Sequence, residues 1–364
     1  MNKGFWTILA VILVILLGGY GLWRSNHEAP SKETVRIGAV LGFTGYAVQD
    51  ATSIKRGLDL AQADLAAKGV VVDISYQDDS TDPKKTISAL QYLLTTYHPD
   101  VIVGPTWSFL ESAAQPTIDA GKVVAYAPAD TSEFVENVST YQFHGAPRNA
   151  LMDAPVAKWL KENGKKRIAI VVTQSAWSHT VEAAFKKAAT EAGAEVVFLQ
   201  ALPDVDTAKA LESVFPSLVG KTPDSILWTG TEPDAVMLVQ QIAKHHLNVP
   251  VIAASSVYRQ IASSNTVSTD TLKNVYQLET PVSAEFIAKY KAKYGEEPTA
   301  YADRAYDGLM LLVEAIQNAP AKDGDSIAKY LREETSYRGF GGRYEFDQNG
   351  DAKEGVWEIH PVVQ

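Results

Sequence analysis

The chain alternates short apolar runs with longer stretches in which apolar residues recur at helical spacing. The run VRIGAVLGF at 35–43 predicts a buried strand, and ATSIKRGLDLAQADLAAKG at 51–69 predicts an amphipathic helix. This alternation continues to about residue 130 and restarts with KKRIAIVVTQ at 165–174. Because nearly continuous Val/Ile strands separated by helices are typical of a parallel sheet covered on both faces, we expect an α/β protein with two similar lobes.

The restart of the pattern sets the expected domain boundaries. We expect residues 35–147 and 278–338 in lobe one, and residues 148–277 and 339–364 in lobe two. The tail GRYEFDQNGDAKEGVWEI alternates apolar and polar residues around Asn349-Gly350, which predicts a hairpin.

Residues 1–34 differ from the rest of the chain and are expected to form a membrane anchor or signal segment with a polar tether. Twenty uncharged residues separate Lys3 from Arg24, and about 20 apolar residues suffice for a helix to cross a bilayer. Trp6 and Trp23 are typical of membrane interfaces. A cleaved secretory signal is the alternative. We expect an uncleaved anchor that holds the body at the extracytoplasmic face of the membrane, periplasmic or at the cell surface.

Composition and motifs exclude several classes of function. The 364 residues carry a formal net charge of −10 and no basic run, which argues against a nucleic-acid partner. The absence of cysteine rules out thiol nucleophiles, thiolate metal sites and disulfides. The sequence lacks a dinucleotide-binding glycine motif, a P-loop, a zinc-protease helix and a nucleophile elbow. We therefore expect neither an enzyme nor a cofactor or metal.

Polar and aromatic residues follow the predicted strands of both lobes, where ligands bind in open α/β sheets. The candidates in lobe one are Tyr46, Trp107, Ser108, Asp130 and Thr131, and those in lobe two are Trp177, Thr231, Glu232 and Ser255. Helix capping is the alternative explanation for two of them, because SFLE at 108–111 predicts a capping box with Ser108 as the cap, and TEPD at 231–234 a looser one. Capping does not explain Trp107 or Trp177.

Several motifs along the chain, taken in order and spacing, carry a family resemblance. They are VRIGAVLGFTGYA, GLDLAQADLAAKG, YQDDSTDPKKTISALQYLL, VIVGP, AYAPADT, RIAIVVTQS and YEFDQNGD, and the likeness covers about residues 35 to 360. Through these motifs the chain resembles the type I periplasmic solute-binding proteins of the leucine/isoleucine/valine-binding group, which are the receptors of ABC importers. The resemblance implies two Rossmann-like lobes joined by three crossovers that close around a small ligand, and ABC permease subunits as partners.

The resemblance also implies roles for single residues. Ser108 or Trp107 would bind a ligand carboxylate together with a helix N-terminus, and Thr131 would act with the backbone of Ala129. Trp177 would supply an aromatic contact to the ligand, and Thr231, in the turn before the next helix, would supply another contact to the ligand.

One position departs from the family pattern. The acidic residue that usually follows the VIAAS strand and takes an ammonium group is replaced by Ser255 and Ser256. Either Asp130 or Glu232 substitutes for it, or the ligand lacks an ammonium and is an amide, a urea-like compound or an aromatic acid. A sensory protein that reports to a separate signalling partner is a further alternative, since one fold serves both functions.

Overall fold

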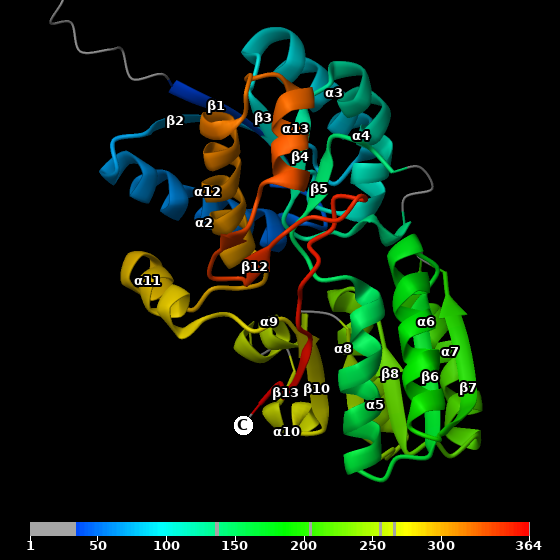
Figure 1. The fold of residues 1–364 in the computed structure, drawn as a ribbon. Helices are drawn as coiled ribbons and strands as arrows, with labels where there is room; N and C mark the ends of the chain where they lie inside the picture. The colour runs from blue at the N-terminus through cyan, green and yellow to red at the C-terminus, as the bar shows by residue number, and fades with distance from the viewer. Residues whose placement is uncertain (1–33, 135–137, 204–205, 255–256, 265–266, 364) are drawn as a thin grey trace, which may run out of the picture.

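The computed structural model describes residues 34–134, 138–203, 206–254, 257–264 and 267–363. They form two lobes, each built on a sheet with helices packed against it (Figure 1).

The first sheet has the strand order β2-β1-β3-β4-β5, and all neighbouring strands are parallel. Its strands are β1 (Thr34–Leu41), β2 (Val71–Asp78), β3 (Val101–Val103), β4 (Val124–Ala127) and β5 (Gln142–His144). The helices of this lobe are α2 (Val48–Ala67), α3 (Pro83–Tyr92), η1 (Leu93–Tyr97), α4 (Ser108–Gly121), η2 (Ser132–Phe134), α11 (Ala284–Tyr294), α12 (Ala302–Asn318) and α13 (Gly324–Glu333).

The second sheet has the order β13-β10-β9-β8-β6-β7, and only the pair β13–β10 is antiparallel. Its strands are β6 (Arg167–Thr173), β7 (Glu195–Leu202), β8 (Ser225–Trp228), β9 (Val251–Ala253), β10 (Val275–Glu279) and β13 (Glu358–Pro361). Its helices are η3 (Asn149–Met152), α5 (Asp153–Glu162), α6 (Ala176–Glu191), α7 (Thr207–Gly220), α8 (Glu232–Lys244), α9 (Val257–Ser264) and α10 (Thr269–Leu272). A small ribbon of β11 (Tyr337–Arg338) and β12 (Arg343–Tyr344) completes the described elements.

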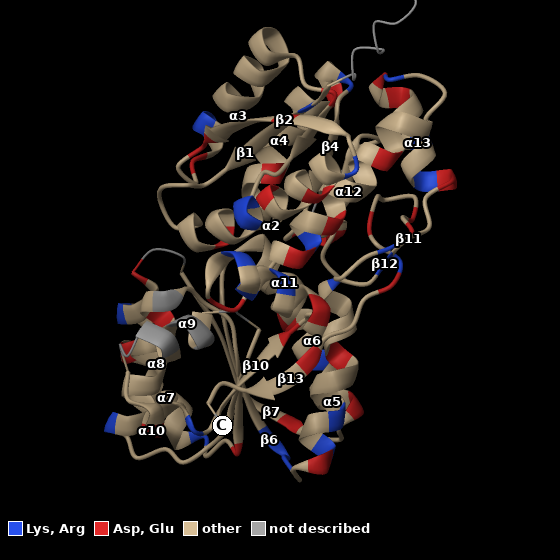
Figure 2. Cartoon of the chain, turned by 90° about the vertical axis from the view of Figure 1, so that its left-hand side faces the viewer, with Lys and Arg blue, Asp and Glu red and all other residues tan. Residues whose placement is uncertain are grey.

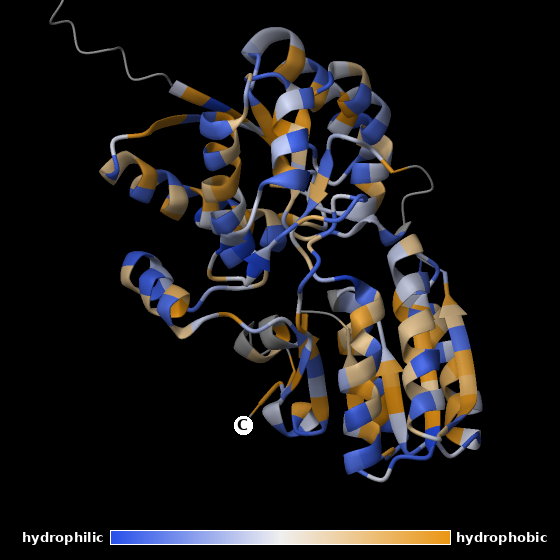
Figure 3. Ribbon diagram, in the orientation of Figure 1, coloured by the Kyte–Doolittle hydropathy of each residue, from blue (hydrophilic) through white to orange (hydrophobic). Residues whose placement is uncertain are grey.

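Burial of apolar side chains follows the sequence pattern. The central strands β3 and β4 are buried along their whole length, as expected for parallel strands covered on both faces. Strands β7 and β8 are largely hydrophobic, whereas the helices alternate hydrophobic and hydrophilic residues (Figure 3). Lys and Arg residues lie interspersed with Asp and Glu over both lobes (Figure 2).

The chain passes between the lobes three times. It leaves the first sheet after β5, returns after β10, and leaves again before β13. After the second passage α12 packs closely on α2. The two helices approach so closely at Gly57 that a side chain would not fit there, since a Cβ atom would lie 2.0 Å from the carbonyl oxygen of Ala302. The expected fold of two α/β lobes with parallel sheets is confirmed.

The C-terminal tail differs from the expected domain division. Phe346 and Ala352 are buried in the first-lobe core, and the Phe346 ring meets Phe143 edge-on at 5.1 Å between centroids. An antiparallel bridge joins Phe346 to Ala352 around the predicted Asn349-Gly350 turn. Residues 339–352 were expected in lobe two, but an alternating pattern does not specify which core buries the apolar face.

No helix in the described part of the chain is long and apolar enough to cross a membrane. The expected anchor falls on residues 1–33, which lie outside that part.

Candidate functional site

Trp107 follows β3 and is the N-cap residue of α4, with extended backbone angles. Its indole Nε1 donates a hydrogen bond of 2.9 Å to Oδ2 of Asp50, in the first turn of α2. Burial raises the pKa of Asp50 to about 6, and the bond from Trp107 partly opposes this increase. Asp50 was not among the expected site residues, because only the fold brings it to a tryptophan 57 residues further along the chain.

Ser108 does not cap α4, contrary to the sequence prediction. It is the first helical residue, and the helix has no side-chain cap. The expected partner, Glu111, instead directs Oε1 to Nε2 of His144 at 2.8 Å. A buried imidazole competes for this carboxylate, because a charge-assisted bond is stronger than a bond to a backbone N–H. The first N–H groups of α4 are thus left without a capping side chain.

The loop after β4 contains the next three candidates. Ala129 is half-buried, and Asp130 and Thr131 are buried. The Thr131 hydroxyl donates to Oε2 of Glu133 at 3.2 Å. Asp130 is only 6% exposed, and its Oδ2 has no hydrogen-bond partner. Burial, followed by the nearby charge of Glu111, raises the pKa of Asp130 well above its ordinary value, which favours the neutral, protonated carboxyl.

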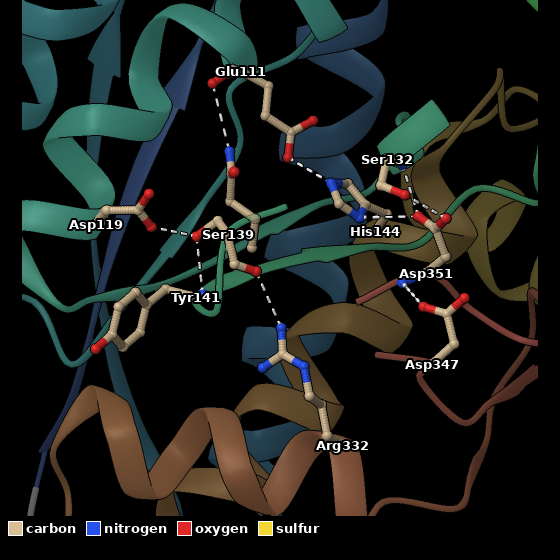
Figure 4. Close-up of polar contacts among 10 residues, drawn as sticks. Glu111, Asp119, Ser132, Ser139, Tyr141, His144, Arg332, Asp347 and Asp351 are labelled. Carbon is tan, nitrogen blue, oxygen red and sulfur yellow. Dashed lines mark hydrogen bonds and ion pairs between the residues drawn. The ribbon is translucent and has the colours of Figure 1, made fainter. Parts of the chain in front are cut away.

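A buried histidine joins this loop to the helix and the tail. His144 lies between two carboxylates, with Nε2 2.8 Å from Glu111 Oε1 and Nδ1 3.1 Å from Asp351 Oδ1 (Figure 4). Burial alone would lower the pKa of His144, but the charge of Glu111 and the contacts with Asp351 raise it to about 10. The imidazole is therefore cationic at neutral pH.

The second lobe presents hydroxyl groups where its strands end. The Ser178 hydroxyl lies 2.7 Å from that of Thr173 and 3.0 Å from that of Thr229, and it accepts a bond of 2.9 Å from Ser175. Ser175 also caps α6 by accepting from the backbone N–H of Ser178. Trp177, in the first turn of this helix, is half-buried against the second-lobe core.

The predicted capping box at α8 is confirmed. Thr231 is the N-cap residue, and its backbone N–H and hydroxyl both donate to Oδ2 of Asp234 at 2.9 Å and 2.7 Å. Two other second-lobe candidates, the Glu232 side chain and Ser255, lie outside what the structure describes.

The structure brings most first-lobe candidates to one edge. Trp107, Ser108 and residues 129–131 follow the adjacent strands β3 and β4. Tyr46 follows β1 and is 83% exposed. The second-lobe helix that carries Trp177 contacts both η2 and α4 of the first lobe. Trp177 thus lies on an element that neighbours the one carrying Trp107 and Ser108, across the boundary between the lobes.

Residues 34–357 match the family of periplasmic binding proteins. The chain belongs to this family. The expected resemblance is confirmed, and the family is one of binding proteins rather than enzymes.

Most of the chain aligns with relatives of this periplasmic binding protein. The Leu/Ile/Val-binding protein homolog 2 of Brucella abortus (strain 2308) is 24% identical over 368 residues, which cover 96% of this chain and 94% of the relative.

Two solved structures share its fold. The branched-chain amino acid transporter substrate binding protein LivJ of Streptococcus pneumoniae, in complex with isoleucine, has a TM-score of 0.77 at 20% identity, covering 90% of this chain and 99% of that one. The solute binding protein of an ABC transporter from Rhodopseudomonas palustris BisB5, in complex with 3,4-dihydroxybenzoic acid, has a TM-score of 0.73 at 20% identity, covering 91% and 98%.

Proposed function

We propose that this periplasmic binding protein is the extracytoplasmic solute receptor of an ABC importer. It binds a small molecule, an amino acid or a related compound, between the lobes and delivers it to permease subunits. The observation that carries the proposal is the uncapped N-terminus of α4 beside Trp107, on an element that contacts the second lobe. The relatives named for Leu, Ile and Val, and the isoleucine complex of the similar fold, support an amino-acid ligand.

A ligand carboxylate would bind at the start of α4. A helix N-terminus offers free backbone N–H groups and the positive end of the helix dipole. The comparable helices α6 and α8 have their first turns capped by Ser175 and by the Thr231–Asp234 pair. We therefore place the carboxylate at Trp107 and Ser108, with Ala129 and Thr131 beside it.

The remaining candidates complete the proposed site. Tyr46 and Trp177 would contact the ligand side chain, and Thr231, Glu232 and Ser255 would contribute from the second lobe.

An amino group on the ligand would need an acidic partner. Asp130 is the expected counter-charge, and Asp50 beside Trp107 is a second acid at the same edge. Burial raises the pKa of both carboxyls, and for Asp130 well above the ordinary value, so an ammonium that binds at Asp130 would have to displace its proton. That cost favours a second candidate ligand class, an aromatic acid without an ammonium, as in the 3,4-dihydroxybenzoic acid complex of the similar fold.

Mass spectrometry of the solute released from the purified protein would identify the ligand, and calorimetry with that compound would then test the acids. If Asp130 binds an ammonium, Asp130→Asn should weaken binding by about 2–5 kcal/mol, as when one member of a buried charge pair is lost. Equal affinities of wild type and Asp130→Asn would remove Asp130 from the site and favour the ligand without a positive charge.

The anchoring of the receptor is a separate part of the proposal. Residues 1–23 remain attached as a membrane helix, because the apolar stretch is about long enough to span a bilayer, ~20 residues. N-terminal sequencing of the mature protein tests this, and a start near Leu22 would instead identify a cleaved signal. Genes for a permease and an ATPase beside this one would support import, whereas a neighbouring kinase gene would favour a sensory role.

A further inference from the structure

The C-terminal turn reaches back to the proposed ligand loop. Asp351 accepts two hydrogen bonds from Ser132, one from the backbone N–H and one from the hydroxyl, each 2.7 Å long. The two residues are 219 positions apart, and Ser132 directly follows Thr131. Asp351 is only 1% exposed. A buried carboxylate that holds a backbone N–H fixes the course of the chain at that point.

The opposite side of Asp351 is held by His144. The imidazole Nδ1 lies 3.1 Å from Asp351 Oδ1 (Figure 4). The backbone N–H of His144 also donates to the carbonyl of Gly350 at 2.8 Å. Burial would raise the pKa of Asp351, but the His144 and Ser132 contacts lower it. The carboxylate therefore remains charged, and it cannot turn away from Ser132 without leaving Nδ1 of the imidazolium without its carboxylate, since Glu111 faces only Nε2.

The same loop is attached to the second lobe one residue later. The Glu133 carboxylate accepts from the backbone N–H of Asn149 at 2.5 Å and of Ala150 at 3.0 Å. These N–H groups belong to η3, just after the chain first enters the second lobe. A shift of Ser132 would move both Thr131 and Glu133, and so would disturb the ligand loop and its attachment to the second lobe together.

We propose that Asp351 is a positioning residue that holds Ser132, and through it Thr131 and Glu133, in the geometry that binds ligand. The residue touches no ligand itself. The proposal rests on the function proposed above, since it takes the loop at 129–131 to be part of the ligand site.

The test compares Asp351→Asn with Asp347→Asn, a matched change in the same turn. Asp347 Oδ1 accepts from the backbone N–H groups of Asn349 and Asp351, and an amide oxygen can still do so. We expect Asp351→Asn to weaken binding of the co-purified solute, or of isoleucine, by roughly 10-fold to 100-fold, the range for loss of a charged hydrogen bond. Asp347→Asn should change it by less than about twofold. Equal affinities of Asp351→Asn and wild type would overturn the proposal.

Hydrogen exchange without ligand separates this proposal from the proposed function. Amides at 129–133 should exchange faster in Asp351→Asn, and to a smaller degree in Ser132→Ala, which keeps the backbone bond and serves if the first variant fails to fold. Unchanged exchange in both would refute the positioning role. Faster exchange in a protein whose wild type binds neither amino acids nor aromatic acids would instead refute the proposed ligand class alone.

A pH profile distinguishes positioning from a general loss of stability. His144 faces Glu111 from α4, Asp130 from the loop after β4, and Asp351 from the tail. Removing the charge of Asp351 lowers the pKa of His144, which is about 10 in the wild type. The protection of the amides at 129–133, corrected for the rise of intrinsic exchange with pH, should therefore be lost at lower pH in Asp351→Asn than in wild type. The same pH dependence of this protection in both proteins would count against the proposal.

Discussion

The two lobes differ in the polar side chains that they place near their common boundary. The first lobe presents ionisable groups, with Asp50 bonded to Trp107 and His144 held between Glu111 and Asp351. The second presents neutral hydroxyls in a chain from Thr173 through Ser178 to Thr229, and its helices α6 and α8 begin with capped first turns. The difference leads us to expect that changes at His144 and Asp50 in the first lobe depend on pH, whereas a change at the hydroxyl chain of the second lobe does not.

Removal of the histidine should have the largest effect. His144→Ala leaves Glu111 and Asp351 as buried carboxylates without their cation, and we expect it to lower the free energy of unfolding by about 3–5 kcal/mol. Because the pKa of His144 is raised from 6.5 to about 10 in the folded protein, this stabilisation is complete below pH 6.5 and is lost as the pH rises toward 10.

Urea unfolding of wild type and His144→Ala, measured at several pH values between these limits, checks the prediction. A difference in unfolding free energy that stays constant with pH would show that the loss comes from packing and not from charge.

An intermediate effect, of opposite sign, is expected at Asp50. Its pKa is raised from 3.8 to about 6, so the wild type loses stability as the pH rises through this range, and Asp50→Asn does not. The variant should therefore be more stable than wild type above about pH 6, by about 1–2 kcal/mol for a half-buried group. Asn keeps an acceptor for the Trp107 indole, so that bond survives.

The same Asp50→Asn change should weaken binding of any ligand that carries an ammonium group. Asp82→Asn is a suitable control, because Asp82 caps α3 through its side chain and Asn caps a helix about as well. Chemical denaturation tests the expected gain in stability, and calorimetry tests the expected loss of ligand affinity. A variant that loses stability at neutral pH would contradict the raised pKa of Asp50.

The smallest effect is expected in the second lobe. Ser178→Ala removes a hydroxyl shared by Thr173, Ser175 and Thr229 and should lower the unfolding free energy by about 1 kcal/mol, independently of pH from about 5 to about 9. Thr190→Ala, which removes an exposed hydroxyl on the same helix, should change it by less than about 0.5 kcal/mol. A pH-dependent loss in Ser178→Ala would remove the contrast between the lobes.

Features that depend on neighbouring residues were predicted well. The apolar run at 35–43 corresponds to β1, and the helical pattern at 51–69 to α2, with ends that differ by a few residues. The capping box at Thr231 was correct, because both of its members lie within one turn of the helix.

Features that depend on distant residues were not predicted. Ser108 was wrongly expected to cap α4. Its predicted partner, Glu111, binds His144 instead, and His144 lies 33 residues further along the chain, where a local pattern does not reach. Asp50 was missed for the same reason, and Phe346 was expected in the wrong lobe because a hairpin pattern does not specify which core it joins. At Ser108 a long-range contact outweighs a local capping preference worth about 1 kcal/mol.

The threefold passage of the chain between the lobes sets the order in which they can be completed. The first-lobe core draws on residues from Val35 to Ala352, so its assembly must wait for α12 to reach α2 and for Phe346 to reach β5. The second sheet has five of its six strands within 167–279. A nascent chain therefore begins the first lobe before the second, but it cannot complete the first-lobe core until residue 352, after five of the six strands of the second sheet have been made. The first lobe also contains the hydrogen bond between Ser53 and Thr299, which are 246 positions apart, and contacts of such sequence separation slow folding most.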